Sequence, residues 1–215
     1  MALIGANLVC LQAKGMAMLV FWKERLVFLA VPKTGTTAIE GALAPKAALV
    51  LRDPPILKHA TVQRYKRILQ PMLEITKEPP FDTVAVVRDP VDWLGSWYRY
   101  RHRDDLVGRP NSTRGRSFDA FVSAYMADPQ PGFAAVGSQA KFLRAPDGTL
   151  GVTHLFRYEA RPRLIRFLED RLSTTITLNR LNVSPPADMT LSPDIASALR
   201  QACAGEYAVW EAGVA

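Results

Sequence analysis

The chain has 215 residues, a formal net charge of +7 at pH 7, 48% hydrophobic residues and 22% charged residues. This composition excludes wholesale disorder, and the length suits one globular domain with a substantial core. The basic excess favours anionic partners, but charge alone does not separate nucleic acid from a nucleotide or a sulfated sugar.

The N-terminal stretch is apolar, and we expect residues 1–18 to be a peripheral segment of a single domain spanning 1–215. No charge precedes its hydrophobic part and Lys14 interrupts it, so we expect neither a signal peptide nor a membrane helix. Met16 or Met18 is an alternative start. The two cysteines, Cys10 and Cys203, form no close pair. They predict free thiols in a reducing compartment, hence a cytoplasmic location, and no metal site.

The first third of the chain alternates strand and helix signals. Residues 18–22 and 25–31 are β-rich runs separated by two charged residues, which predicts a hairpin or two adjacent strands. Residues 36–44 predict a short helix and 46–58 a loop. Apolar residues at helical spacing predict a helix over 59–73, with Pro71 as its stop.

A second buried strand is predicted over residues 81–88, followed by a helix over 91–103. Asp89 suits the N-cap of this helix and Pro90 its first turn. The later elements are a polar loop (103–117), a helix (118–127), an extended segment (151–159), a helix (161–172), a strand (173–178) and a tail helix capped by Ser192 and stopped at Gly205. Strands alternating with helices predict an α/β fold with a central, mainly parallel sheet flanked by helices.

Residues 32–37, "PKTGTT", stand where a strand hands over to a helix. Such a turn leaves backbone N–H groups without partners, and with the helix dipole they form an anion site. Gly35 lets the backbone approach the anion closely. The side chains able to add hydroxyl or ammonium donors are Thr34, Thr36, Thr37 and Lys33. The motif predicts a phosphate cradle; the alternative is an ordinary strand-to-helix turn.

This cradle differs from the usual nucleotide triphosphate loop. Ala30 holds the position of that loop's first glycine, and Thr36 stands where its lysine follows the second glycine.

A second motif, "VVRDPVDWLGSWYRY", places Arg88 at a strand end and Ser96 on the next helix. Ligands of open α/β sheets bind beyond the carboxyl ends of strands, so Arg88 and Lys33 should face the same crevice. Arg88 can hold a phosphate bidentately and Ser96 can donate a hydroxyl. Two anion sites predict a ligand with two separated phosphate-type groups. The alternative for Arg88 is an ion pair with Asp89 or Asp92. We interpret the aromatic residues at helical spacing as core: Trp93, Trp97 and Tyr100.

The two motifs, in this order, resemble the sulfotransferase superfamily that uses 3′-phosphoadenosine 5′-phosphosulfate (PAPS). Residues 142–160 and 181–211 resemble later segments of bacterial and Golgi-type carbohydrate sulfotransferases, so the likeness extends from about residue 26 onward. It implies a three-layer, P-loop-type fold. Its first loop would grip the 5′-phosphosulfate and its second motif the 3′-phosphate. The matching positions are Lys33, Thr34, Gly35, Thr36, Thr37, Arg88 and Ser96. Ala38 departs from the aromatic residue that many relatives carry.

The resemblance implies transfer of a sulfuryl group to a hydroxyl, with a carbohydrate or a glycolipid as the expected acceptor and 3′,5′-adenosine bisphosphate (PAP) as product. Lys33 is suited to neutralising the leaving oxygen, and the scheme requires no metal. His59 is the candidate base, because a histidine that opens a helix has its pKa lowered by the dipole. It could instead be a surface or capping residue. Glu40 and Glu159 are alternative bases, or partners of arginines.

For several residues the sequence supports two interpretations. Asn182 and Ser184 either contact ligand or fix a turn. His102 is interpreted as a solvated member of a basic patch and His154 as a structural residue. Six arginines form either a solvated face or a surface that attracts an anionic glycan or lipid headgroup: Arg99, Arg101, Arg103, Arg109, Arg114 and Arg116.

Two rival functions stay open. One is a kinase-like phosphoryl transferase, which magnesium dependence would support. The other is a non-catalytic nucleotide- or nucleic-acid-binding module, which steep salt dependence of binding would support. On our preferred interpretation we expect no nucleic-acid partner, and the sequence makes no prediction of oligomeric state.

Overall fold

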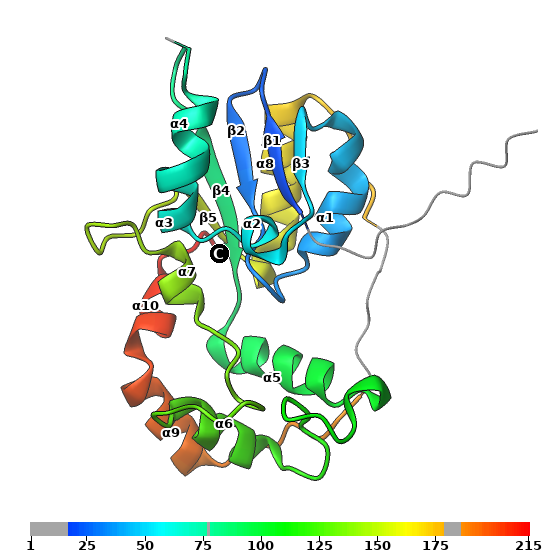
Figure 1. The fold of residues 1–215 in the computed structure, drawn as a ribbon, viewed down its shortest axis with the longest axis vertical. Helices are drawn as coiled ribbons and strands as arrows, with labels where there is room; N and C mark the ends of the chain where they lie inside the picture. Colours follow the sequence, from blue (N-terminus) through cyan, green and yellow to red (C-terminus); the bar gives the residue numbers. More distant parts are fainter. Residues whose placement is uncertain (1–16, 77, 179–185) are drawn as a thin grey trace, which may run out of the picture.

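The structure is a computed structural model that describes residues 17–76, 78–178 and 186–215. Its five strands form one sheet in the order β3-β1-β2-β4-β5 (Figure 1). The strands are β1 (Met18–Phe21), β2 (Leu26–Leu29), β3 (Leu49–Leu51), β4 (Asp82–Val87) and β5 (His154–Arg157).

The prediction of an α/β fold is confirmed, but the sheet is only partly parallel. β4 pairs in parallel with β2 and β5, whereas β1 pairs antiparallel with both β2 and β3. The turn that joins β1 to β2 is too short for the crossover that a parallel connection needs, so the predicted hairpin forms. The sheet is therefore mixed.

Helices cover both faces of the sheet (Figure 1). One face carries α1 (Thr36–Leu43) and α8 (Arg161–Leu172). The other carries a continuous helical segment and α7 (Gln139–Leu143). That segment comprises α3 (Val62–Arg64), the π-helical turn η2 (Tyr65–Leu69) and α4 (Gln70–Leu73). The remaining helices are α2 (Pro55–Lys58), α5 (Pro90–Arg101), α6 (Phe118–Met126), α9 (Pro193–Ala202), α10 (Ala204–Glu211) and the 3-10 turns η1 (Ala44–Lys46), η3 (Asp104–Leu106) and η4 (Tyr158–Ala160).

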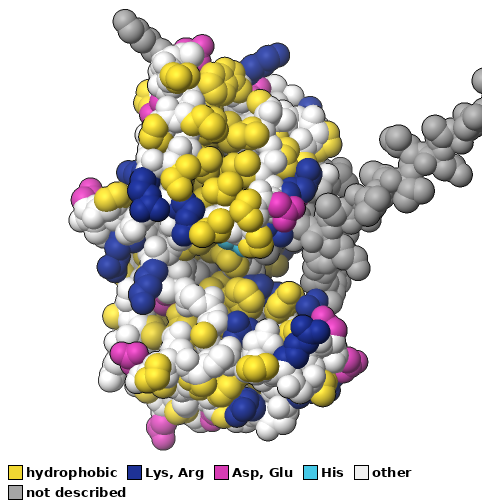
Figure 2. All heavy atoms as spheres, viewed as in Figure 1, with side chains coloured by type: hydrophobic (Ala, Val, Ile, Leu, Met, Phe, Trp, Pro, Cys, Tyr) yellow, Lys and Arg dark blue, Asp and Glu magenta, His cyan; other side chains and the backbone are white. Residues whose placement is uncertain are grey.

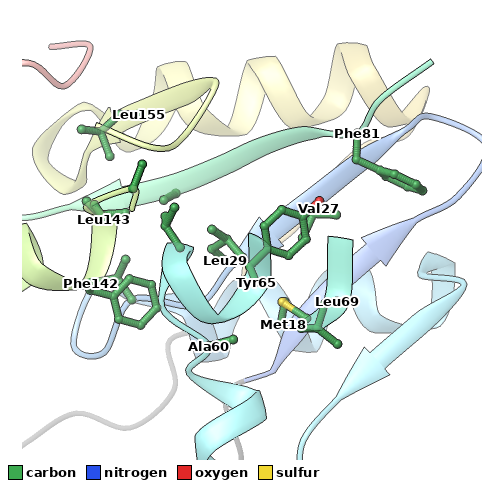
Figure 3. Close-up of a cluster of buried hydrophobic side chains, with 14 of the residues drawn as sticks. Met18, Val27, Leu29, Ala60, Tyr65, Leu69, Phe81, Phe142, Leu143 and Leu155 are labelled. Carbon is green, nitrogen blue, oxygen red and sulfur yellow. The ribbon is translucent and has the colours of Figure 1, made fainter. Parts of the chain in front are cut away.

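The hydrophobic core follows the two-residue period of the strands. In β1, Met18 and Val20 face the α3–α4 side, whereas Leu19 and Phe21 face the α1–α8 side. Figure 3 shows the first of these clusters, in which Tyr65 packs over the sheet. A third cluster joins α5, α6, α9 and α10 beyond the sheet.

The N-terminal prediction needs correction at its end. Ala17 and Met18 are each only 1% exposed, because Met18 opens a central strand that is paired on both sides. The predicted peripheral segment therefore does not include these two residues, and residues 1–16 lie outside the described part of the chain. Cys10 lies there as well, whereas Cys203 is a half-buried free thiol.

Two further local predictions are wrong. Residues 173–178 form no strand: Ile176 N donates to the Glu169 carboxylate, so the chain folds back on α8. The place beside β5 is taken by Val214, which bridges Phe156 in parallel. Residues 46–58, predicted as a loop, contain β3 and α2.

The predictions that helices end at Pro71 and at Gly205 are also wrong. Pro71 lies inside α4, and Gln70 N bonds to Tyr65 O in the preceding π-helical turn. Pro71 therefore lacks its N–H at a point where the backbone hydrogen bonds have already shifted from the α-helical to the π-helical spacing. Gly205 lies in the first turn of α10, while α9 ends at Ala202.

Candidate functional site

The loop between β2 and α1 has two residues in the left-handed region of the backbone. Lys33 has φ 68° and Gly35, the N-cap of α1, has φ 77°. A Cβ added to Gly35 would lie 2.9 Å from Cε2 of Tyr158. Conformation and space therefore both require glycine at this position. The close neighbour is the Tyr158 ring, so the approach of an anion to Gly35 stays a prediction. Lys33 holds a conformation that costs free energy in a non-glycine residue, and such residues cluster at functional sites.

Donors of this loop are available to an anion. The backbone N–H groups of Lys33, Thr34 and Gly35 donate to no acceptor in the described part of the chain. The Thr36 hydroxyl is buried and has no hydrogen-bond partner among the described residues. The Thr34 hydroxyl differs, because it donates to Val31 O at 2.9 Å. Thr34 can therefore offer a ligand only its backbone N–H, whereas Thr37 is half-buried in the first turn of α1.

The Lys33 ammonium points toward the side chains of α5. Its Nζ lies 4.3 Å from the ring centroid of Tyr100 and 5.7 Å from that of Trp97. Burial, and then the nearby guanidinium groups of Arg103, Arg88 and Arg99, lower the pKa of Lys33 to about 8. These four cations give the loop an excess of positive charge that an anionic ligand would neutralise.

Arg88 bonds the second motif to the loop. Its Nη1 donates to Lys33 O at 3.3 Å, and its Cζ lies 4.4 Å from the ring centroid of Tyr158. Its Nε donates to the Asp92 carboxylate at 2.7 Å. The ion pair considered as the alternative is therefore present, and it leaves the other N–H groups of the guanidinium for a ligand.

The backbone of Arg88 is held by a buried amide. Gln139, which is fully buried, accepts from Arg88 N and donates to Arg88 O, both at 2.9 Å. The Glu206 carboxylate in turn accepts from Gln139 N, and burial raises the pKa of that carboxyl group. This chain of bonds fixes Arg88 to α7 and α10.

The helix predicted after Arg88 is confirmed as α5, with Asp89 as cap and Pro90 in its first turn. Ser96 is buried on it, one turn before Arg99, which is half-buried and contacts the Met189 sulfur. The aromatic interpretation holds for Trp93, which is 2% exposed, but not for Tyr100, which is 36% exposed. Tyr100 lies on the solvent side of α5 because it stacks on Lys33 and Arg103.

His59 is fixed to the start of the loop between β2 and α1. Its Nδ1 lies 2.8 Å from Ala30 O, and because a carbonyl can only accept, Nδ1 carries the proton and Nε2 is left as the base. The pKa of His59 is lowered, as predicted, but the cause differs. His59 follows the end of α2 rather than opening a helix, and burial is the largest contribution.

Each alternative base has hydrogen-bond partners, although Glu40 Oε2 is buried without one among the described residues. Glu40 is 5% exposed, and its Oε1 accepts from Arg52 Nε at 2.7 Å, as predicted for an arginine partner. Glu159 has no arginine partner among the described residues; its carboxylate accepts from Asp89 N and from Trp210 Nε1. Asn182 and Ser184 lie outside the described residues.

The two other histidines differ from each other. His154 stacks on Phe167 and its Nε2 lies 3.8 Å from the Asp82 carboxylate, so it packs as a structural residue. His102 was predicted to be solvated, but it packs against Tyr98 and its Nδ1 is buried without a partner among the described residues. Arg101 is one of the six arginines predicted to form a solvated face or an anion-attracting surface. It is not free in solvent, because its guanidinium donates to the carbonyl oxygens of Gly132 and Ala135.

Sequence reasoning missed Tyr158, Gln139 and Arg99 as members of the site. Tyr158 and Gln139 lie far from both motifs along the chain and follow no periodic pattern that identifies them. Arg99 stood only within the group of six arginines, although its place one turn after Ser96 was a usable signal.

No family model, curated protein or solved structure matches this chain. Within residues 17–76, 78–178 and 186–215, no group of three or more His, Cys, Asp or Glu side chains could hold a metal ion. Every helix in those ranges is too short or too polar to cross a membrane.

Proposed function

We propose that this protein is a sulfotransferase that moves a sulfuryl group from PAPS to a hydroxyl acceptor, with a carbohydrate or glycolipid as the acceptor class. One observation carries the proposal. His59 bonds to Ala30 at one end of the loop from Ala30 to Gly35, and Arg88 bonds to Lys33 within that loop. The loop, the strand-end arginine and the histidine, which were predicted separately, therefore lie together.

The residues present fit an anionic donor of this kind. The loop offers N–H groups and a Thr36 hydroxyl that have no partner among the described residues, together with the Lys33 ammonium. Arg88, which follows β4, and Ser96 and Arg99, which lie on α5, are the residues that we assign to a second anion position. Two such positions suit the two phosphate-type groups of PAPS, whose role is to supply the activated sulfuryl group.

Different residues of the chain would then have different roles in the transfer. The loop N–H groups hold the transferred group in line with the acceptor hydroxyl. His59 Nε2 takes the proton of that hydroxyl as the new O–S bond forms. Lys33 stabilises the charge on the leaving phosphate oxygen as the old O–S bond breaks. Product PAP leaves with the bonding electron pair.

A thermal-shift titration with PAP tests the donor assignment. At about 100 times its dissociation constant, a ligand stabilises the fold by roughly 2.7 kcal/mol. We expect a shift with PAP that Arg88→Ala abolishes and that Arg163→Ala, an exposed arginine on α8, leaves unchanged. A shift with magnesium ATP alone would favour the kinase-like rival. Transfer of labelled sulfate to a panel of hydroxyl acceptors then separates an enzyme from a binding module.

A further inference from the structure

An exposed apolar surface lies along the helical segment that follows β3. Of the eight large hydrophobic side chains exposed in the described residues, four belong to residues 56–75: Ile56, Ile68, Met72 and Ile75, exposed by 54%, 46%, 54% and 83%. Figure 2 shows a broad yellow area over the upper half of the molecule, bordered by dark blue side chains. We call these four residues the apolar patch.

Folding does not explain the apolar patch. The segment from α3 to α4 already packs Val62, Tyr65, Leu69 and Leu73 into the core. Figure 3 shows Tyr65 and Leu69 in this cluster. Ile68 and Met72 are one turn apart and stay exposed, so the helix has a second apolar face. Contiguous exposed apolar surface with a polar border marks an interaction site.

The border of the patch is basic. Lys58, Arg64, Lys66 and Arg67 lie on the same stretch, and none forms an ion pair with another described residue. A cavity of about 410 Å³ is lined by three of these cations together with Thr61, Gln63 and Pro146.

One carboxylate of this helical segment is turned away from that border. Glu74 is half-buried and accepts from Phe81 N and Gln70 Nε2. The surface therefore combines exposed apolar side chains with an excess of basic ones, with Asp147 as a carboxylate near Lys66.

We propose that the apolar patch and its basic border dock this protein on the surface of an anionic lipid bilayer. Apolar side chains enter the interface while lysine and arginine bind anionic headgroups. A second copy of the chain fits less well, because pairing the same surface would bring the four unpaired cations of each copy together. Docking needs no membrane-spanning helix.

The inference does not require the proposed function. If that function holds, docking would place α2, and His59 at its end, beside the bilayer, where lipid-linked acceptors are found.

Co-sedimentation of the full chain with vesicles tests the proposal. The vesicles contain phosphatidylcholine alone or an equal mixture with phosphatidylglycerol. We expect binding to the mixed vesicles only. Lys66→Gln/Arg67→Gln should lower the binding affinity about tenfold. Ile68→Ser/Met72→Ser should also lower it about tenfold. Matched controls are Arg163→Gln/Arg166→Gln on the opposite face and Val107→Ser/Val214→Ser, which should bind as the native chain does.

The assay uses no donor, so its result is independent of sulfuryl transfer. Absence of binding to either vesicle overturns the proposal, as does equal loss in the control variants. Concentration-dependent dimers in sedimentation equilibrium that Ile68→Ser/Met72→Ser dissociates would assign the patch to a second copy instead. Binding that survives both patch variants but is lost on removal of residues 1–16 would assign docking to that segment. Unchanged melting temperatures of the variants exclude misfolding as the cause.

Discussion

The imidazole Nδ1 of His59 lies 2.8 Å from the carbonyl oxygen of Ala30, the residue that follows β2. Because Ala30 stands at the start of the loop that carries Lys33, this bond fixes the candidate base relative to the candidate phosphate cradle. A base positioned by a backbone bond presents its second nitrogen in one tautomer and one orientation.

The first prediction concerns removal of this base. His59→Ala should lower kcat by about 10² to 10⁴, the usual contribution of a positioned general base, while the thermal shift with PAP persists. His154→Ala is the matched control and should retain turnover. Native turnover in His59→Ala, or equal losses in both variants, would contradict the assignment.

The pH profile gives a second prediction. Burial lowers the pKa of His59 below its ordinary value of 6.5, so the neutral, proton-accepting form persists into mildly acidic solution. If the proposed transfer occurs, the acidic limb of kcat/KM should therefore have its midpoint below pH 6.5 in the native chain. A midpoint above that value would mean that another group, or a charged histidine, controls the limb.

The third prediction concerns Lys33. Its pKa of about 8 means that the ammonium loses its proton as the pH rises from 7 to 9, and a deprotonated amine no longer attracts an anion. The dissociation constant of PAP, measured by calorimetry, should rise across this range. Lys33→Met should bind more weakly at pH 7 and show a flat profile. Parallel profiles in the two proteins would remove Lys33 from the binding site.

Much of the fold was predictable because local signals decided it. The two β-rich runs of residues 18–31, separated by two charged residues, and the cap formed by Asp89 act over a few residues, and both predictions are confirmed. The strand predicted at 173–178 failed for a non-local reason, since Val214 from the C-terminal end occupies the place beside β5. The edge strand β3 carried too short an apolar run to be distinguished from a loop.

For the candidate site, the sequence predicted the loop and the strand-end arginine because each belongs to a strand-to-helix junction. It could not predict that Tyr158 closes over Gly35 or that Gln139 holds Arg88, since both contacts join segments more than 50 residues apart. The same limit explains why the lowered pKa of His59 was assigned to a helix dipole, whereas burial of the side chain is its largest cause.

Gly35→Ala is the fourth prediction. The new Cβ would lie 2.9 Å from Tyr158 Cε2, in a backbone conformation with φ 77°. We expect a loss of unfolding free energy of about 1 to 3 kcal/mol and weaker PAP binding.

Gly148→Ala is the matched control, since its φ is 89° and its Cβ would meet nothing within 4 Å. Gly148→Ala should lower the unfolding free energy because of its backbone conformation, but it should bind PAP as the native chain does. Equal PAP affinity in both variants would show that the close approach of Tyr158 has no part in the site.

The final prediction concerns the amide that holds Arg88. Gln139→Leu removes both bonds to the Arg88 backbone and leaves a buried N–H and C=O unsatisfied, at a cost of about 1 to 3 kcal/mol each. Urea unfolding should report this loss, and the affinity for PAP should fall because the guanidinium loses its fixed place. Gln130→Leu, on an exposed glutamine whose side chain donates to Tyr125 O, is the comparison and should leave PAP affinity unchanged. If Gln139→Leu is destabilised yet binds PAP as the native chain does, Gln139 supports the fold alone and Arg88 needs no such support to hold an anion.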